Sequence, residues 1–180
     1  PAAPVSPSSK AIAIFADPVY SAGDGRLQHA AAPAASRALD AVIEARDALV
    51  RSASRLHGGS RARVEEHFPR LPFARIEAEA IAGVVPAQGR TVAIGFEATR
   101  AAALRPETGE HRIIHFATHA VLNTRQPELS GIVLSLLDED GRPQDGFLRL
   151  RDVSELRLRS DLVALSACQT ALGKEVRGEG

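Results

Sequence analysis

One apolar run near the end of the chain, residues 161–168, constrains the fold more than any other feature. It reads Asp-Leu-Val-Ala-Leu-Ser-Ala-Cys, and Gln-Thr-Ala-Leu-Gly follows it. A short apolar run of this kind predicts a buried strand of a parallel sheet, and the residues after it predict a turn into a helix. Cys168, the single cysteine of the 180 residues, therefore ends a predicted central strand. Open α/β sheets place their reactive groups at such strand ends.

A second apolar run brings a histidine to an equivalent position. Residues 111–120 read His-Arg-Ile-Ile-His-Phe-Ala-Thr-His-Ala and predict a strand over 112–117, with His119 just beyond it. A thiol attacks only as thiolate, and its pKa of about 8.5 falls beside an imidazolium or a helix N-terminus. The pair thus predicts Cys168 as a nucleophile and His119 as its general acid and base. The backbone N–H groups of Ala120 and Cys168 are candidate donors to the oxyanion.

Strands and helices alternate along the chain, which predicts a mainly parallel sheet between helical layers. Apolar runs predict further strands over residues 10–15, 71–73, 91–96, 131–137 and 147–150. Helical periodicity predicts helices over 34–57 and 74–84, a short helix over 99–104 with Thr99 as its N-cap, and a helical turn over 152–156. The Asp-Glu-Asp-Gly stretch at 138–141 is typical of a hairpin turn, and it lacks the spacing of a calcium-binding loop.

Composition narrows the function classes. Lys and Arg together number 22, as do Asp and Glu, so a dedicated nucleic-acid binder is not expected. No apolar stretch approaches the roughly 20 residues that span a bilayer, and residues 1–9 lack the features of a signal peptide. A single cysteine fits a reducing, cytoplasmic setting.

We expect residues 1–9 to be a flexible lead-in and residues 10–180 to form one domain. Because methionine is absent even at position 1, we expect the chain to be a piece of something longer.

The spacing of the two reactive residues resembles that of caspases. Caspases carry their cysteine in a Gln-Ala-Cys-[Arg/Gln/Gly]-Gly motif, with the histidine about 50 residues upstream. Here 49 positions separate His119 from Cys168, and the local sequence Ser-Ala-Cys-Gln-Thr keeps the central Ala-Cys-Gln.

Three stretches make the resemblance more specific, and on them the chain is identified as a member of the CHAT domain family, which is related to caspases and separases. They are Leu-Pro-Phe-Ala-Arg-Ile-Glu-Ala-Glu-Ala-Ile at 71–81, His-Phe-Ala-Thr-His-Ala at 115–120 and the cysteine motif at 162–173. The resemblance covers roughly residues 10–180. It implies a caspase-like three-layer α/β sandwich with a mainly parallel central sheet, incomplete at the C-terminus.

The resemblance also implies an activity: a cysteine endopeptidase with a His119/Cys168 dyad, acting on a protein substrate without a metal or organic cofactor. Ala120 departs from the family pattern, since caspases and many relatives have Gly there. The family implies control by attached TPR repeats or partner proteins, commonly in bacterial defence and cell-death systems. The rest of the peptidase domain is expected either as a second chain, made by cleavage after the cysteine, or as a segment missing through truncation.

Asp17 is a candidate substrate-binding residue. It ends the first predicted strand, near the place where caspase relatives have a residue of the S1 pocket. A carboxylate there predicts a preference for Lys or Arg at P1. The alternative is that Asp17 only begins the Asp-Pro turn.

Other interpretations of these residues remain open. Cys168 is alternatively a buried structural thiol, and the domain is alternatively a catalytically silent caspase-like interaction module or another cysteine hydrolase acting on small amides. His115 and His119 have the i, i+4 spacing of metal ligands on a helix, but on a strand that spacing spans roughly 13 Å. We therefore predict that His115 is structural and orients or packs near His119. The remaining histidines are predicted to be solvated: His29, His57, His67 and His111.

Overall fold

The computed structural model describes residues 10–27, 68–121, 127 and 130–166. The predicted lead-in over 1–9, the predicted helix over 34–57 and Cys168 lie outside the described residues. So do three of the histidines predicted to be solvated: His29, His57 and His67.

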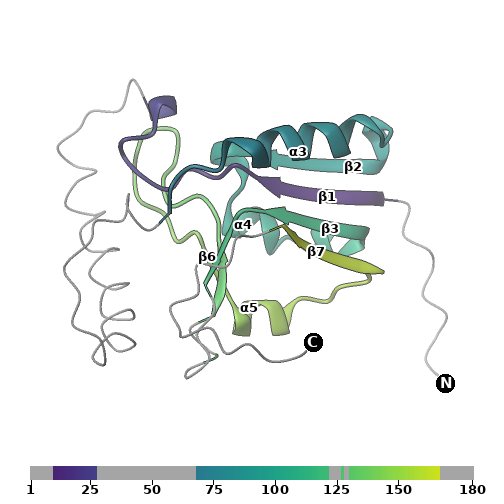
Figure 1. Cartoon of the computed structure of the whole chain (residues 1–180). Coiled ribbons are helices and arrows are strands. Elements are labelled where there is room, and N and C mark those ends of the chain that lie inside the picture. Colours follow the sequence, from purple (N-terminus) through teal and green to yellow (C-terminus); the bar gives the residue numbers. More distant parts are fainter. Residues whose placement is uncertain (1–9, 28–67, 122–126, 128–129, 167–180) are drawn as a thin grey trace, which may run out of the picture.

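Four parallel strands form the main sheet, which Figure 1 shows with its helices. They are β1 (Lys10–Ala16), β2 (Arg90–Ile94), β3 (His111–Ala117) and β7 (Leu162–Ser166), in the order β2-β1-β3-β7. All four lie where the apolar runs predict strands. The pairing of β3 with β7 ends at Ala117 opposite Ser166, so the two runs that carry the predicted dyad are neighbours in the sheet.

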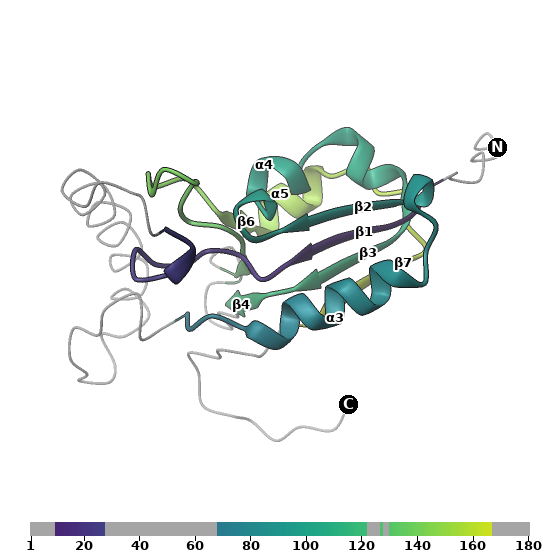
Figure 2. The ribbon, with the colours of Figure 1, turned by 90° about the horizontal axis from the view of Figure 1, so that it is seen from above.

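Helices cover both faces of this sheet and complete three layers (Figure 2). Helix α3 (Pro72–Gly83) lies on one face; α4 (Arg100–Ala103) and α5 (Leu150–Glu155) lie on the other. Short 3₁₀ helices connect the elements: η1 (Gly25–Leu27), η2 (Ala87–Gly89), η3 (Gly95–Glu97) and η4 (Pro106–Glu110). None of the described helices has the length and apolarity that crossing a membrane requires.

Helix α3 forms where the sequence has small apolar residues at i, i+4 and i+8. Ala74, Ala78 and Ala82 are buried against the sheet, and their small side chains let the helix backbone approach it closely. The predicted strand over 71–73 is wrong, because Pro72 occupies the first turn of α3. Proline is favoured there, since its fixed φ suits a helix and its missing N–H would have no intrahelical acceptor.

The core lies on both faces of the sheet, as the alternation along β1 requires. On the α3 face the buried residues are Ile12, Ile14, Ala16, Ala74, Ala78, Ala82 and Ala117. On the opposite face they are Ala13, Phe15, Ala93, Ala103, Ile114, Phe116, Ile132, Leu134 and Leu148. Phe15 and Phe116 stack there with ring centroids 5.1 Å apart, a contact worth about 0.5–1.5 kcal/mol beyond its buried area.

A second, antiparallel sheet begins one residue after β3. Its strands are β4 (His119–Val121), β5 (Gly131–Val133) and β6 (Phe147–Arg149), in the order β4-β5-β6. The predicted hairpin is confirmed, although β5 is shorter than the predicted strand over 131–137. The predicted turn at 138–141 is also confirmed: the N–H of Gly141 donates to the carbonyl of Asp138 at 3.0 Å. The predicted N-cap is confirmed too, since Thr99 accepts from the N–H of Ala102 at 3.0 Å.

Strand β7 differs from its prediction in its surroundings. The sequence predicts a central, buried strand, yet within the described part of the sheet β7 has β3 as its neighbour on one side and lies at the edge. Leu162, Val163 and Leu165 are 53%, 44% and 56% exposed. An apolar strand is buried only when strands flank both of its edges and other elements cover both of its faces. Among the described residues, β3 is the one strand that flanks β7.

Candidate functional site around His119 and Asp17

His119 lies in a buried position immediately beyond the main sheet. Strand β3 ends at Ala117, Thr118 makes a bend, and β4 begins at His119. The histidine is 2% exposed. Its ring packs against Tyr20, with centroids 5.1 Å apart, and against Phe68, with centroids 5.4 Å apart.

Hydrogen bonding distinguishes the two ring nitrogens of His119. Nε2 lies 2.8 Å from the carbonyl oxygen of Pro69. A carbonyl only accepts, so Nε2 carries the proton and donates it. Nδ1 is buried and has no hydrogen-bond partner among the described residues. In the neutral ring Nδ1 therefore presents a lone pair that can accept a proton.

A second buried polar pair supports this region. The hydroxyl of Tyr20 lies 2.7 Å from Oγ1 of Thr118, and the Thr118 hydroxyl donates to the carbonyl of Val133. The Tyr20 hydroxyl is therefore the donor to Thr118. Burial, the largest cause, raises the pKa of Tyr20 to about 12, while the Thr118 hydrogen bond opposes the rise. The phenol thus stays protonated at neutral pH and tethers the bend before His119.

A shallow surface cavity of about 230 Å³ opens on the outer side of the aromatic residues that cover His119. Tyr20 and Phe68, which both contact His119, form part of its wall. Its other lining residues are Ser21, Gly23, Asp24, Gly25 and Arg70. The cavity is large enough for a single side chain, and Tyr20 and Phe68 separate it from the imidazole of His119.

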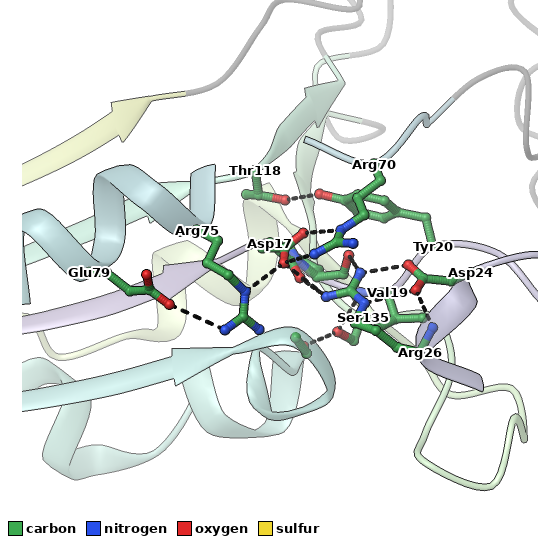
Figure 3. A network of polar contacts seen from close by, with 12 residues as sticks. Asp17, Val19, Tyr20, Asp24, Arg26, Arg70, Arg75, Glu79, Thr118 and Ser135 are labelled. Carbon is green, nitrogen blue, oxygen red and sulfur yellow. Dashed lines mark hydrogen bonds and ion pairs between the residues drawn. The ribbon is translucent and has the colours of Figure 1, made fainter. Parts of the chain in front are cut away.

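Asp17 is the centre of an ion-pair cluster next to this cavity (Figure 3). Its side chain is completely buried. Oδ2 lies 3.0 Å from Arg26, 2.8 Å from Arg70 and 3.2 Å from Arg75, and Oδ1 accepts from Nε of Arg70 at 2.9 Å. The Asp17 carboxylate thereby connects three segments: Arg26 follows β1, Arg70 precedes α3, and Arg75 lies within α3.

The backbone at Asp17 explains why an aspartate suits this position. Its φ is +45°, in the left-handed region that Asp and Asn enter more readily than other non-glycine residues. Two further acidic residues balance the arginines: Asp24 pairs with Arg26 at 2.6 Å, and Glu79 pairs with Arg75 at 3.3 Å. Both oxygens of Asp17 are occupied, so a basic P1 side chain would have to displace one of these guanidinium groups.

His115 lies on the α3 face of β3 and contacts that helix. It is 7% exposed, and Nε2 lies 3.0 Å from Oε1 of Glu77. The other carboxylate oxygen of Glu77 accepts from the hydroxyl of Ser166 at 3.1 Å. Glu77 therefore contacts both β3 and the last residue of β7. Glu77 lies within the 71–81 stretch that resembles the family, but no motif in the sequence distinguishes it from the other acidic residues of the helix.

His111 corrects a prediction. It is 1% exposed rather than solvated. Nδ1 lies 3.1 Å from the carbonyl of Thr108, and Nε2 lies 3.0 Å from the hydroxyl of Thr91. Because both ring nitrogens have partners, the imidazole is buried without the loss of a hydrogen bond. In the described ranges, no three His, Cys, Asp or Glu residues are grouped so that they could hold a metal ion.

A mainly parallel sheet between helical layers defines a three-layer α/β domain, and the buried histidine beyond a central strand is consistent with the caspase-like type. Residues 4–180 match the family model described as CHAT domain, so the chain belongs to the CHAT domain family. This family is related to caspase-like cysteine peptidases. No curated protein and no solved structure matches the chain significantly.

Proposed function

We propose that this domain is a cysteine endopeptidase in which Cys168 is the nucleophile and His119 the general acid and base. The observation that carries the proposal is the buried, oriented imidazole of His119, with Nε2 bound to Pro69 and Nδ1 unpartnered among the described residues. Strand pairing supports it: Ala117 lies opposite Ser166, and each reactive residue comes two positions later in the sequence.

The proposed reaction uses groups of this chain alone. Nδ1 of His119 accepts the proton of the Cys168 thiol, and the thiolate attacks the carbonyl carbon of the scissile peptide bond. The tetrahedral oxyanion collapses as the imidazolium gives its proton to the leaving amine. Water then attacks the thioester, His119 takes a proton from it, and the acid product leaves as the thiol is restored. The N–H groups of Ala120 and Cys168 stay the predicted oxyanion donors.

The predicted preference for a basic P1 residue now depends on the arginine cluster. Arg70 is 44% exposed and lines the cavity, so it is the guanidinium that a substrate would displace most readily. Displacing it exchanges one ion pair for another, which gives little net gain in affinity. The occupied carboxylate therefore favours the alternative, in which Asp17 is structural.

The exposed edge of β7 supports a proposed partner. We propose that the remaining part of the peptidase domain, on a second chain or a further segment, covers the apolar residues of β7. The family resemblance adds regulatory repeats or partner proteins, a cytoplasmic location and a role in bacterial defence, and these stay predictions.

Labelling of the cysteine tests the catalytic proposal. The complete domain is treated with a peptidyl electrophile at pH 7, and adduct formation on Cys168 is followed by mass spectrometry. We expect rapid labelling of the wild type and labelling at least about 100-fold slower for His119→Ala, because positioned general bases contribute about 10²–10⁴-fold. Equal rates for the two proteins, or no labelling of the activated wild type, would overturn the proposal and favour an interaction module.

A fluorogenic peptide panel tests the P1 preference separately. Peptides that differ only in carrying Arg, Lys, Asp or Leu at P1 are compared for kcat/KM. If Asp17 is structural, Arg and Lys peptides gain no special advantage over Leu. A strong preference for Arg and Lys would instead restore the substrate-binding role of Asp17.

A further inference from the structure

Glu77 connects the two strands that precede the proposed catalytic residues. One carboxylate oxygen lies 3.0 Å from Nε2 of His115 on β3, and the other accepts from the Ser166 hydroxyl on β7 at 3.1 Å. We propose that Glu77 is a positioning residue, which fixes the end of β7 against β3 and α3 and thereby sets the approach of Cys168 to His119. This inference rests on the proposed peptidase function.

The position of Ser166 gives this contact its significance. Ser166 is the last residue of β7, and Cys168 follows two residues later. Within the described sheet, β7 pairs with β3 on one side and lies at the edge. An edge strand is held by one ladder of backbone hydrogen bonds, so a side-chain bond at its end adds a restraint in a different direction, toward α3.

His115 restrains the other half of the carboxylate. Its ring is buried, whereas the Glu77 side chain is 38% exposed. Nε2 of His115 lies close to the carboxylate without forming a hydrogen bond, so the buried ring limits the room in which the carboxylate can turn while its other oxygen accepts from Ser166. Three groups thus restrain the end of β7: helix α3, which carries Glu77, the buried imidazole of His115 and the hydroxyl of Ser166. This arrangement also gives His115 a structural role that acts through Glu77.

Helix geometry separates Glu77 from its neighbour Glu79. Ala78 is buried against the sheet, so the residues on either side of it point along the sheet in opposite directions. Glu77 points toward β7 and bonds Ser166; Glu79 pairs with Arg75, which binds Asp17. Glu79 is therefore a matched control: the same residue type, on the same helix, without a contact to β7.

The test compares variants of the complete domain by the kcat and KM of peptide cleavage. We expect Glu77→Ala and Ser166→Ala each to lower kcat about tenfold while KM stays within about twofold, because small misplacements of a reacting group cost one to two orders of magnitude. Ser166→Thr keeps the hydroxyl, so it is expected to restore kcat to within about threefold. Glu79→Ala is expected to behave as wild type.

The double variant shows whether the two residues act together. If Glu77 acts through Ser166, the Glu77→Ala/Ser166→Ala protein is no slower than Glu77→Ala alone. Multiplied losses, or a Ser166→Ala protein with the wild-type kcat, would overturn the inference. Ser166 is exposed, so Ser166→Ala is expected to fold. It can therefore test the inference even if Glu77→Ala does not fold.

Failure of this inference is distinguishable from failure of the proposed function. A wild type that cleaves peptide and loses activity in His119→Ala, but is unaffected by Ser166→Ala, overturns only the role of Glu77. A wild type with no cleavage in the complete, activated domain overturns both.

Discussion

The imidazole of His119 donates from Nε2 to the carbonyl oxygen of Pro69, 50 positions earlier in the chain, over 2.8 Å. Residues 68–71 lead directly into α3, so the start of that helix fixes the ring orientation. A backbone carbonyl cannot be removed by changing the side chain of its residue. The orientation of His119 is therefore built into the path of the main chain.

This contact predicts the tautomers of two histidines. In its neutral form His119 is expected to carry its proton on Nε2. His111 is the internal control, because its Nδ1 faces the carbonyl of Thr108 and must carry the proton instead. Long-range ¹H–¹⁵N correlation spectra distinguish the two forms. The same tautomer at both residues would contradict the geometry.

Tyr20, the single tyrosine of the chain, is expected to ionise only at about pH 12. Absorbance at the phenolate band follows this directly, and no other tyrosine interferes. Because the folded pKa is raised above the unfolded value of about 10, the stabilisation is complete below that value and is lost as pH rises from about 10 to 12. Thr118→Val removes the acceptor of the phenol and is expected to loosen the bend before His119. A phenolate signal near pH 10 in the folded wild type would count against the buried position.

Asp17→Asn is expected to lower the free energy of unfolding by about 3 kcal/mol, since it leaves three arginines around a neutral side chain. Asparagine keeps the tolerance for positive φ, so the loss reports on charge rather than on backbone strain. Denaturant unfolding measures the change. Glu79→Gln is the control: its exposed ion pair with Arg75 is expected to contribute less than about 1 kcal/mol. Equal effects of both changes would contradict the central role of Asp17.

The ion pair between Arg100 and Asp152 predicts a specific loss of stability in acid. Arg100, the largest cause, holds the pKa of Asp152 below its usual value, and the backbone N–H of Arg149 adds to the effect. A depressed pKa means that the stabilisation is present above the ordinary carboxyl value of about 3.9 and is lost as pH falls below it. Asp152→Asn should therefore be less stable than wild type at pH 7 and show a flatter decline below about pH 4. Parallel pH profiles of unfolding would be inconsistent with this pair.

The edge of β7 is expected to promote self-association of the 180-residue chain. Among the described strands β7 has a neighbour on one side, and its apolar side chains and the backbone groups of its other side favour pairing with another strand. Leu165→Lys should reduce light scattering at high protein concentration. Ile76→Lys makes the same kind of change on α3, where the side chain is 60% exposed, and should have a smaller effect. Equal reductions would point to general apolar exposure rather than to strand pairing.

The sheet could be predicted from the sequence because its strands depend on local signals. Each strand of the main sheet is a short apolar run, and the N-cap of α4 depends on one threonine and its neighbours. The chemistry of the proposed dyad requires the strands that precede His119 and Cys168 to be neighbours, as β3 and β7 are, but nothing in the sequence predicts the places of β1 and β2 in the sheet. The exposure of β7 could not be predicted, because burial depends on neighbours that a strand's own sequence does not encode.

The supporting contacts of the site were harder to predict for a similar reason. The acceptor for His119 is a backbone carbonyl, which every residue carries, so Pro69 has no distinguishing signal. The three arginines around Asp17 come from separate segments, and no spacing relates Arg26 to Arg70. Burial of His111 depends on Thr91, 20 positions away. Such pairings arise only once the chain is folded.

The cluster at Asp17 has a consequence for how this sequence can diverge. Asp17 is the acceptor that Arg26, Arg70 and Arg75 have in common, so replacing the acid removes an ion pair from all three at once, whereas replacing one arginine leaves the other two pairs in place. Among homologues, substitutions should therefore be accepted first at the three arginine positions and last at Asp17. A homologue without the aspartate is expected to have lost most of the arginines as well.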